Sequence, residues 1–206
     1  MLTLYYAPRT CALASLIALE ESGTPFQVEK VDFSTSAQRS PAYLKINPKG
    51  RVPALATGRG IITETPAILA YIAHIGSQRR LAPIEDAFAF AEMQAFNAYL
   101  ASTVHVAHAH MRRGQRWSDD AAAIETMKAK VPENMTECFR LIEEGMLQGP
   151  WVMGERYSVA DPYLFTFAGW LKGDGVEPSL FPRIAEHRER MLGRPAVERA
   201  MALEGA

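Results

Sequence analysis

The sequence predicts two domains of different class, an α/β domain followed by an all-helical domain. Signals for β-strands occur only in about the first 80 residues, where they alternate with helical patterns. From about Asp86 onward, long helical patterns replace them. The segment "GSQRRLAPIED" between the two is polar and contains proline, as linkers do. We therefore expect an α/β domain over residues 1–80, a linker over 81–87 and a helical domain over 88–206.

The first elements are a strand, a turn, a helix and a second strand. The run "LTLYYA" favours a strand, and Pro8 ends it. A helix over residues 12–22 follows, and Gly23 and Pro25 end it. The second strand is "FQVEKVDF", although its alternation slips near Lys30.

A hairpin and a helix complete the first domain. "VPALAT", a turn at residues 58–60 and "IIT" predict two antiparallel strands. In "ETPAILAYIAHIG", Thr65 is the expected N-cap, Pro66 the first helical residue and Gly76 the end. The order is β-α-β, a loop, then β-β-α.

The second half contains helical patterns only. Ser158 and Asp161 have the spacing of a reciprocal N-cap, which we assign to folding. We interpret Trp170 as helix core. The helical segments are "AFAFAEMQAFNAYLASTVHVAHAHM", "SDDAAAIETMKAKVPENMTECFRLIEEGML", "SVADPYLFTFAGWLK", "FPRIAEHRERML" and "PAVERAMAL".

Composition limits the partners. With 206 residues, 48% of them hydrophobic, the chain can bury a sizeable core, and its net charge of -1 argues against nucleic acid. No apolar stretch approaches the roughly 20 residues that span a bilayer, and the N-terminus does not resemble a secretory signal. We expect a cytoplasmic protein with Cys11 and Cys138 reduced, and no membrane partner.

Cys11 stands where the first strand turns into the first helix. The N–H groups at a helix N-terminus stabilise a thiolate, or an anion that a ligand brings. Ala14 occupies the position three residues on, so a two-cysteine disulfide cycle is excluded at this site. A small buried packing residue is the alternative at this point.

Two further motifs have chemistry that fits one ligand. In "GRVPAL", Pro53 can form a cis peptide bond and leave Val52 free to pair with an extended peptide. In "TETPAIL", Glu64 and Thr65 can bind an amino acid head at a helix N-terminus. Taken singly, an ordinary strand-start proline and a ligand-free helix cap remain alternatives. Taken together with Cys11, the motifs indicate one ligand that has an amino acid head, a peptide backbone and a thiol. Glutathione is such a ligand.

These motifs resemble the glutathione S-transferase family, and most of all its bacterial beta class. The resemblance is carried by "YYAPRTCALA", "INPKGRVPAL", "ITETPAILAYIA" and "VMGERYSVADPYLF". It implies a thioredoxin-like N-terminal domain of order β-α-β-α-β-β-α, a helical C-terminal domain and a homodimer. It also implies an enzyme of detoxification that conjugates glutathione, its cosubstrate, to small hydrophobic electrophiles.

The resemblance implies a role for each site residue. Cys11 and His105 are the expected catalytic residues at the glutathione sulfur, His105 as a proton acceptor or a hydrogen-bond partner of the thiolate. The expected glutathione contacts are Tyr6 and Thr10 beside Cys11, Val52 with cis-Pro53 on the cysteinyl unit, Glu64 and Thr65 on the γ-glutamyl head, and Arg51 on the glycyl carboxylate.

Departures from the beta-class pattern leave two alternatives to conjugation. Ala12 and Val106 stand where the class often has serine and lysine, Arg39 is the one cation near "STSAQRS", and Asn97 takes a shifted place. A glutathione-dependent reductase acting through a Cys11 mixed disulfide and a non-catalytic binding protein are the alternatives. No metal is expected, because the spacing turns His110 away from His105 and arginines follow it.

Overall fold

The N-terminal domain is built on a four-stranded sheet. The computed structural model describes residues 1–76 and 81–205, so the end of the predicted first domain, residues 77–80, lies outside the described part. The strand order is β2-β1-β3-β4, with β1 parallel to β2 and antiparallel to β3. The predicted hairpin is confirmed as β3 and β4. The strands are β1 (Leu2–Tyr6), β2 (Phe26–Lys30), β3 (Ala54–Thr57) and β4 (Gly60–Thr63).

Three helices complete this domain. The predicted first helix is α1 (Ala12–Ser22), with Gly23 left-handed at its C-cap. The short α2 (Pro41–Ile46) is the helix that the resemblance implied, and α3 (Thr65–Ile75) follows β4. The predicted N-cap of α3 is wrong by one residue, because Glu64 occupies the cap position and its side chain makes no capping hydrogen bond. The order is thioredoxin-like, as expected.

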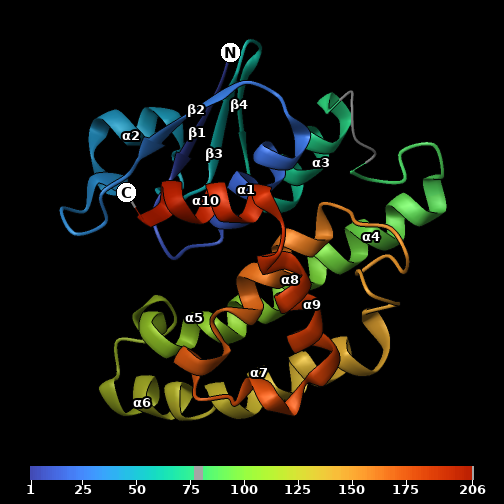
Figure 1. Ribbon diagram of the computed structural model, residues 1–206. Coiled ribbons are helices and arrows are strands. Elements are labelled where there is room, and N and C mark those ends of the chain that lie inside the picture. The colour runs from blue at the N-terminus through green and yellow to red at the C-terminus, as the bar shows by residue number, and fades with distance from the viewer. Residues whose placement is uncertain (77–80, 206) are drawn as a thin grey trace.

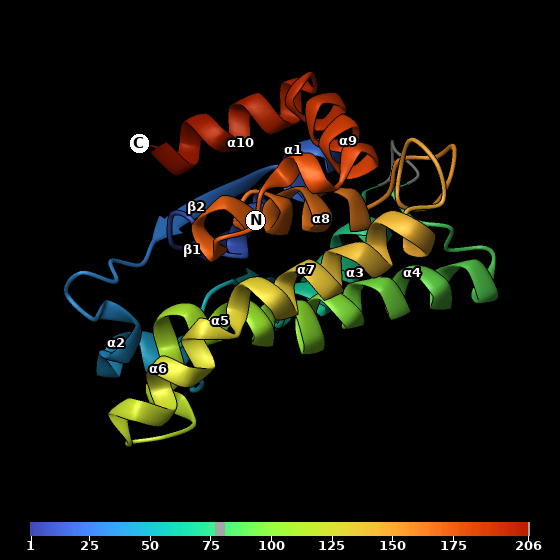
Figure 2. The same ribbon diagram turned by 90° about the horizontal axis from the view of Figure 1, so that it is seen from below.

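The second domain consists of helices (Figure 2). One long rod contains α4 (Ala87–Tyr99), a π-helical turn (Leu100–Val104) and α5 (His105–Arg113). The chain continues through α6 (Ala121–Ala129), α7 (Val131–Leu141), α8 (Ala160–Ala168) and α9 (Pro182–Leu192). The predicted helical patterns therefore all form helices. No helix in residues 1–76 and 81–205 is long and apolar enough to cross a bilayer.

The last helix, α10 (Pro195–Gly205), returns to the first domain and packs on α1 (Figure 1). Arg194 forms an ion pair with Glu21 at 2.6 Å, and Arg199 forms one with Glu20 at 2.6 Å. α1 also contacts α3 and α8, which explains why it is buried on nearly all sides. An amphipathic pattern is weak in such a helix because every face is core.

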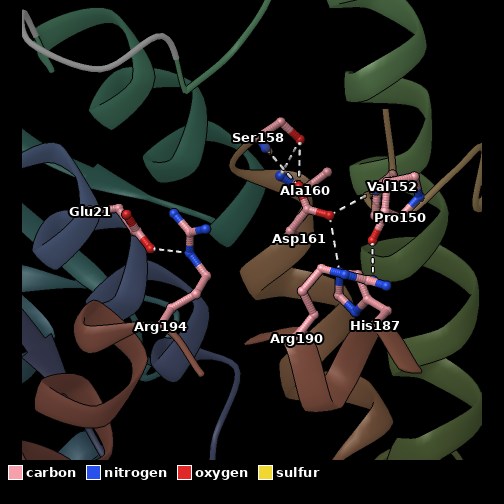
Figure 3. A network of polar contacts seen from close by, with 9 residues as sticks. All are labelled: Glu21, Pro150, Val152, Ser158, Ala160, Asp161, His187, Arg190 and Arg194. Carbon is pink, nitrogen blue, oxygen red and sulfur yellow. Dashed lines mark hydrogen bonds and ion pairs between the residues drawn. The ribbon is translucent and has the colours of Figure 1, made fainter. Parts of the chain in front are cut away.

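A buried polar network fixes the start of α8 (Figure 3). The Asp161 carboxylate accepts hydrogen bonds from the backbone N–H groups of Val152 and Ser158, both at 2.7 Å, and from His187 Nε2 at 3.0 Å. The Ser158 hydroxyl accepts from the N–H of Ala160 at 3.2 Å. The predicted capping pair is therefore present, and its location in the core agrees with a structural role. Nearby, Val159 donates to the carbonyl of Leu81, which anchors the segment between the domains.

Candidate active site

A cavity of about 330 Å³ is lined by residues of both domains. Nearly all of the predicted site residues lie on its wall, although they come from four separate segments of the chain. They are Thr10, Cys11, Arg51, Val52, Pro53, Glu64, Thr65 and His105. Tyr6 is not among the lining residues.

Cys11 occupies the cap position of α1 and is 7% exposed. Its Sγ lies 3.7 Å from the carbonyl oxygen of Val52, to which the thiol donates. Burial raises the pKa of the Cys11 thiol, although Thr65 and Arg113 act in the opposite direction. Of the two effects proposed for the helix N-terminus, stabilisation of this residue's own thiolate is therefore outweighed by desolvation. Cys11 is a protonated hydrogen-bond donor at neutral pH.

Thr10 and Tyr6, which the resemblance placed beside Cys11, lie in different surroundings in the structure. The Thr10 hydroxyl donates to the carbonyl of Ala7 at 2.7 Å and accepts from the N–H of Ala12 at 3.3 Å, so it holds the turn before α1. The Tyr6 hydroxyl instead donates to the carbonyl of Leu203 in α10, at 3.0 Å. Since side chains alternate along a strand, Tyr6 shares the buried face of Leu2 and Leu4. The structure thus directs Tyr6 to α10 and not to the cavity.

The loop before β3 has a rigid support. The peptide bond between Val52 and Pro53 is cis, as predicted. The carbonyl of Arg51 accepts hydrogen bonds from the Tyr43 hydroxyl at 2.8 Å and from Asn47 Nδ2 at 2.7 Å. The segment around α2, to which the sequence pattern assigned no role, therefore positions the loop.

Glu64 has an unusual backbone conformation at the mouth of the cavity. Its φ of 73° is positive, which is uncommon for a residue other than glycine, and such strained conformations are enriched at functional sites. The carboxylate is exposed and forms an ion pair with Lys49. Its carbonyl accepts from the N–H of Ile68 at 3.0 Å, which starts α3. Glu64 thus presents a carboxylate beside the first turn of a helix.

His105 lies on the wall that α5 contributes. Burial, with smaller contributions from His108 and nearby arginines, lowers its pKa to about 3. The ring packs edge-on against Phe167, with 5.3 Å between centroids. His105 is therefore a neutral imidazole at neutral pH, and a weak base.

A second histidine on α5 also lines the cavity. His108 Nδ1 lies 2.8 Å from the carboxylate of Asp174, whose side chain is 1% exposed. The ring stacks on Trp170 with 4.3 Å between centroids. Trp170 lines the cavity as well, so its interpretation as helix core is wrong in part. The spacing of three residues from His105 was the available signal for His108, whereas Asp174 had none.

Arginines dominate the charge of the wall. Arg39 and Arg51 come from the first domain, and Arg113 and Arg116 from the end of α5 and the turn after it. Burial lowers the pKa of Arg116, and the positive charges of Arg113, Arg51 and Arg39 lower it further. No local sequence pattern distinguished Arg113 and Arg116 from surface arginines. The cavity is therefore suited to anions.

Metal binding receives no support from the geometry. The predicted absence of a metal site rests on the sequence alone. In the described part of the chain, no three His, Cys, Asp or Glu side chains are arranged to hold an ion.

The fold and the cavity define a class of protein in which a thioredoxin-like domain and a helical domain build one site together. Residues 1–74 match the glutathione S-transferase N-terminal domain, and residues 116–190 match the C-terminal domain. The chain is 31% identical to the glutathione S-transferase GstA of Escherichia coli O157:H7, with 98% of both chains covered.

Solved structures agree with this match. A glutathione transferase homologue from Sulfitobacter, solved with bound glutathione, is 47% identical with a TM-score of 0.95, covering 98% of this chain and 97% of that one. A beta-class glutathione S-transferase from Sphingomonas chungbukensis is 31% identical with a TM-score of 0.86, covering 98% of both chains. The chain belongs to the glutathione S-transferase family. Membership confirms the expected enzyme class and glutathione as the cosubstrate.

Proposed function

We propose that this protein conjugates the glutathione thiolate to small hydrophobic electrophiles, as a cytoplasmic homodimer that acts in detoxification. The observation that carries the proposal is that Cys11, the cis-Pro53 loop, the N-terminus of α3 and His105 all line one cavity. Two free cysteines fit a reducing compartment.

In the proposed complex, glutathione extends along the first-domain wall. The γ-glutamyl carboxylate binds at the first turn of α3 near Thr65, and its ammonium binds Glu64. The cysteinyl backbone pairs with Val52, which brings the sulfur between Cys11 and His105. The glycyl carboxylate binds Arg51. Both charged ends of glutathione thereby have a partner of opposite charge.

The wall of the cavity stabilises the glutathione thiolate. The protonated Cys11 thiol and one N–H of the neutral His105 ring can each donate a hydrogen bond to the sulfur. Arg113 and the neighbouring guanidinium groups favour negative charge there. The pKa of His105, about 3, makes it a poor proton acceptor, so of its two expected roles we favour hydrogen bonding. The thiol proton leaves to solvent, the sulfur forms a bond to carbon, and the leaving group departs with its electron pair.

Glutathione-dependent disulfide reduction is the second candidate, because Cys11 lies on the cavity wall. In that reaction the Cys11 thiolate attacks a disulfide, forms a mixed disulfide and releases one thiol. A glutathione thiolate then attacks the mixed disulfide, which restores Cys11 and yields oxidised glutathione. The raised pKa of Cys11 leaves little thiolate at neutral pH. Conjugation is therefore favoured, and a non-catalytic role would leave the thiol-stabilising wall without use.

Two substitutions test these assignments. We expect Cys11→Ala to lower kcat/KM for 1-chloro-2,4-dinitrobenzene by at most about tenfold, because one hydrogen bond to the sulfur is lost. Oxidised glutathione should add one glutathionyl group to the wild type, measured by intact mass. That adduct should vanish in Cys11→Ala and persist in Cys138→Ala, whose cysteine is equally buried but lies outside the cavity.

Other outcomes separate the candidates. Retained conjugation with no thiol transfer in Cys11→Ala supports conjugation, whereas complete loss of both activities supports the reductase. Absence of turnover in the wild type, together with a melting temperature that glutathione does not raise, would contradict the proposed function.

A further inference from the structure

The cavity has more positive charge than glutathione alone accounts for. Arg9, Arg39, Arg51, Arg113 and Arg116 line it, and Glu64 is the one acidic side chain on its wall among the described residues. Glu64 already pairs with Lys49. Within residues 1–76 and 81–205, no salt bridge or side-chain hydrogen bond engages the guanidinium groups of Arg39, Arg51, Arg113 and Arg116. Unpaired arginines concentrated in one cavity favour an anionic ligand.

Each of the two domains contributes two of these four arginines. Arg39 lies over Gly50, where an added Cβ would come within 2.9 Å of its Nη1, and this places it next to Arg51. These two lie on the side where we place the glycyl carboxylate of glutathione. Arg113 and Arg116 belong to the helical domain, at the end of α5 and in the following turn. The second carboxylate of glutathione is assigned to α3, so neither carboxylate of glutathione is assigned to this second pair, and Arg113 acts on the thiolate through its charge alone.

Aromatic side chains accompany the second pair of arginines. Trp117 lines the cavity and is 47% exposed, while its ring stacks on His110 with 4.0 Å between centroids. The backbone N–H of Trp117 donates to the carbonyl of Gly114 at 2.9 Å, which fixes the turn that contains Arg116. An exposed ring beside guanidinium groups offers a flat apolar surface and a charge at its edge. Such a surface suits a planar ring with an acidic substituent.

We propose that the second substrate is a small aromatic electrophile with an acidic group, whose anion binds Arg113 and Arg116 and whose ring lies against Trp117. This inference rests on the proposed function and names the substrate class of the same site. In the reaction, the glutathione thiolate forms a bond to the ring carbon that has the leaving group. That group departs as an anion with its electron pair, and the acidic substituent is unchanged.

A matched pair of electrophiles tests the inference. 4-Chloro-3,5-dinitrobenzoate has the acidic group, and 4-chloro-3,5-dinitrobenzamide has the same reactive carbon without the charge. After division by the uncatalysed rates, we expect the wild-type kcat/KM to favour the acid by about tenfold or more. Arg113→Gln and Arg116→Gln should each reduce this preference by about tenfold. The ratio cancels any effect of these substitutions on the glutathione thiolate itself.

Arg112→Gln is the matched control, because Arg112 is the exposed neighbour on α5 and does not line the cavity. It should leave the acid preference unchanged. Equal rates for acid and amide in the wild type would overturn the inference, as would an equal loss of preference in Arg112→Gln. Either result would leave the proposed conjugation standing.

A binding measurement without glutathione distinguishes failure of the inference from failure of the proposed function. 3,5-Dinitrobenzoate and 3,5-dinitrobenzamide have no leaving group. At equal concentration, the acid should quench the fluorescence of Trp117 and Trp170 more strongly than the amide. If neither electrophile is turned over but this selectivity is present and is lost in Arg113→Gln and Arg116→Gln, the acid site stands and conjugation fails. If 3,5-dinitrobenzoate and its amide bind alike, the acid site is refuted.

Discussion

At the scale of single residues, Cys11 and His105 are both neutral at neutral pH, and burial is the main cause in each. Burial disfavours the charged form, so it raises the pKa of the thiol and lowers that of the imidazole to about 3. Two neutral hydrogen-bonding groups beside an electropositive wall form a suitable environment for a ligand's thiolate. The negative charge is then expected on glutathione and not on the protein.

His105 therefore makes stability depend on pH in a defined direction. Its folded-state pKa lies below the unfolded value of 6.5, so the unfolded chain binds more protons between about pH 3 and 6.5. The stabilisation is present above pH 6.5 and is lost as the pH falls towards 3. Between pH 7 and pH 4, the free energy of unfolding should therefore fall in both proteins, and by about 2 kcal/mol more in the wild type than in His105→Asn. Urea denaturation at the two pH values measures this difference.

His74→Asn is the control variant, because it makes the same substitution at an exposed position outside the cavity. Parallel curves for His105→Asn and the wild type would contradict the buried, neutral state of His105.

The site residues that the sequence predicted are those with a local signal. Cys11 was marked by a turn between a strand and a helix, and Val52 by the proline after it. His108 was marked only by its spacing from His105. Arg113 and Asp174 had no signal, since only folding brings Arg113 to the cavity wall and Asp174 to His108. Tyr6 was misplaced because no pattern in the sequence indicates that α10 covers its side of the sheet.

At the scale of elements, α8 depends on one buried carboxylate. Asp161 accepts from Val152, Ser158 and His187, so it joins the start of α8 to the preceding loop and to α9 (Figure 3). An amide in its place keeps the shape but sets an NH2 group against donors and removes the charge. We expect Asp161→Asn to lower the free energy of unfolding by about 3 kcal/mol, measured by urea denaturation at pH 7.

Asp120 offers a matched comparison, because it caps α6 through the N–H of Ala122 at 2.8 Å while exposed to water. Asp120→Asn should cost at most about 0.5 kcal/mol, since asparagine caps helices well and water solvates its amide. Similar losses in the two variants would show that the Asp161 network contributes no more than an ordinary cap.

The strands and most helices were predictable because each has its own period and its own end signals. Gly23 and the hairpin glycines are examples. The pattern of α10 identified a helix but not its partner, and its packing on α1 is set by tertiary contacts. The short α2 lacked enough turns to show a period, and only the family resemblance implied it.

At the scale of the whole molecule, α10 ties the two domains together. α10 packs on α1, and Arg194 in the turn before α10 pairs with Glu21, whose side chain is 1% exposed. The Arg194 guanidinium also lies 3.9 Å from the ring centroid of Tyr157, in the second domain. α10 thus stabilises the arrangement in which the N-terminal domain and α5 face each other across the cavity. The site requires this arrangement, because neither wall is complete without the other.

If the protein is a homodimer as proposed, exposed apolar side chains at and just before the start of α4 are candidates for its interface. Phe88 is 74% exposed and Ile84 is 43% exposed. A second cavity of about 670 Å³ is lined by Ile84 and by Ala89, the residue after Phe88. Neighbouring apolar side chains exposed to water next to a cavity indicate a surface that a partner covers.

If that partner is a second copy of the chain, Phe88→Ser should raise the dimer dissociation constant by about tenfold or more, measured by sedimentation equilibrium. Leu180→Ser removes another exposed apolar side chain, 58% exposed, and should have no effect. A wild-type protein that sediments as a monomer at micromolar concentration would refute the dimer and leave the catalytic proposal intact, because every residue assigned to the cavity belongs to one chain.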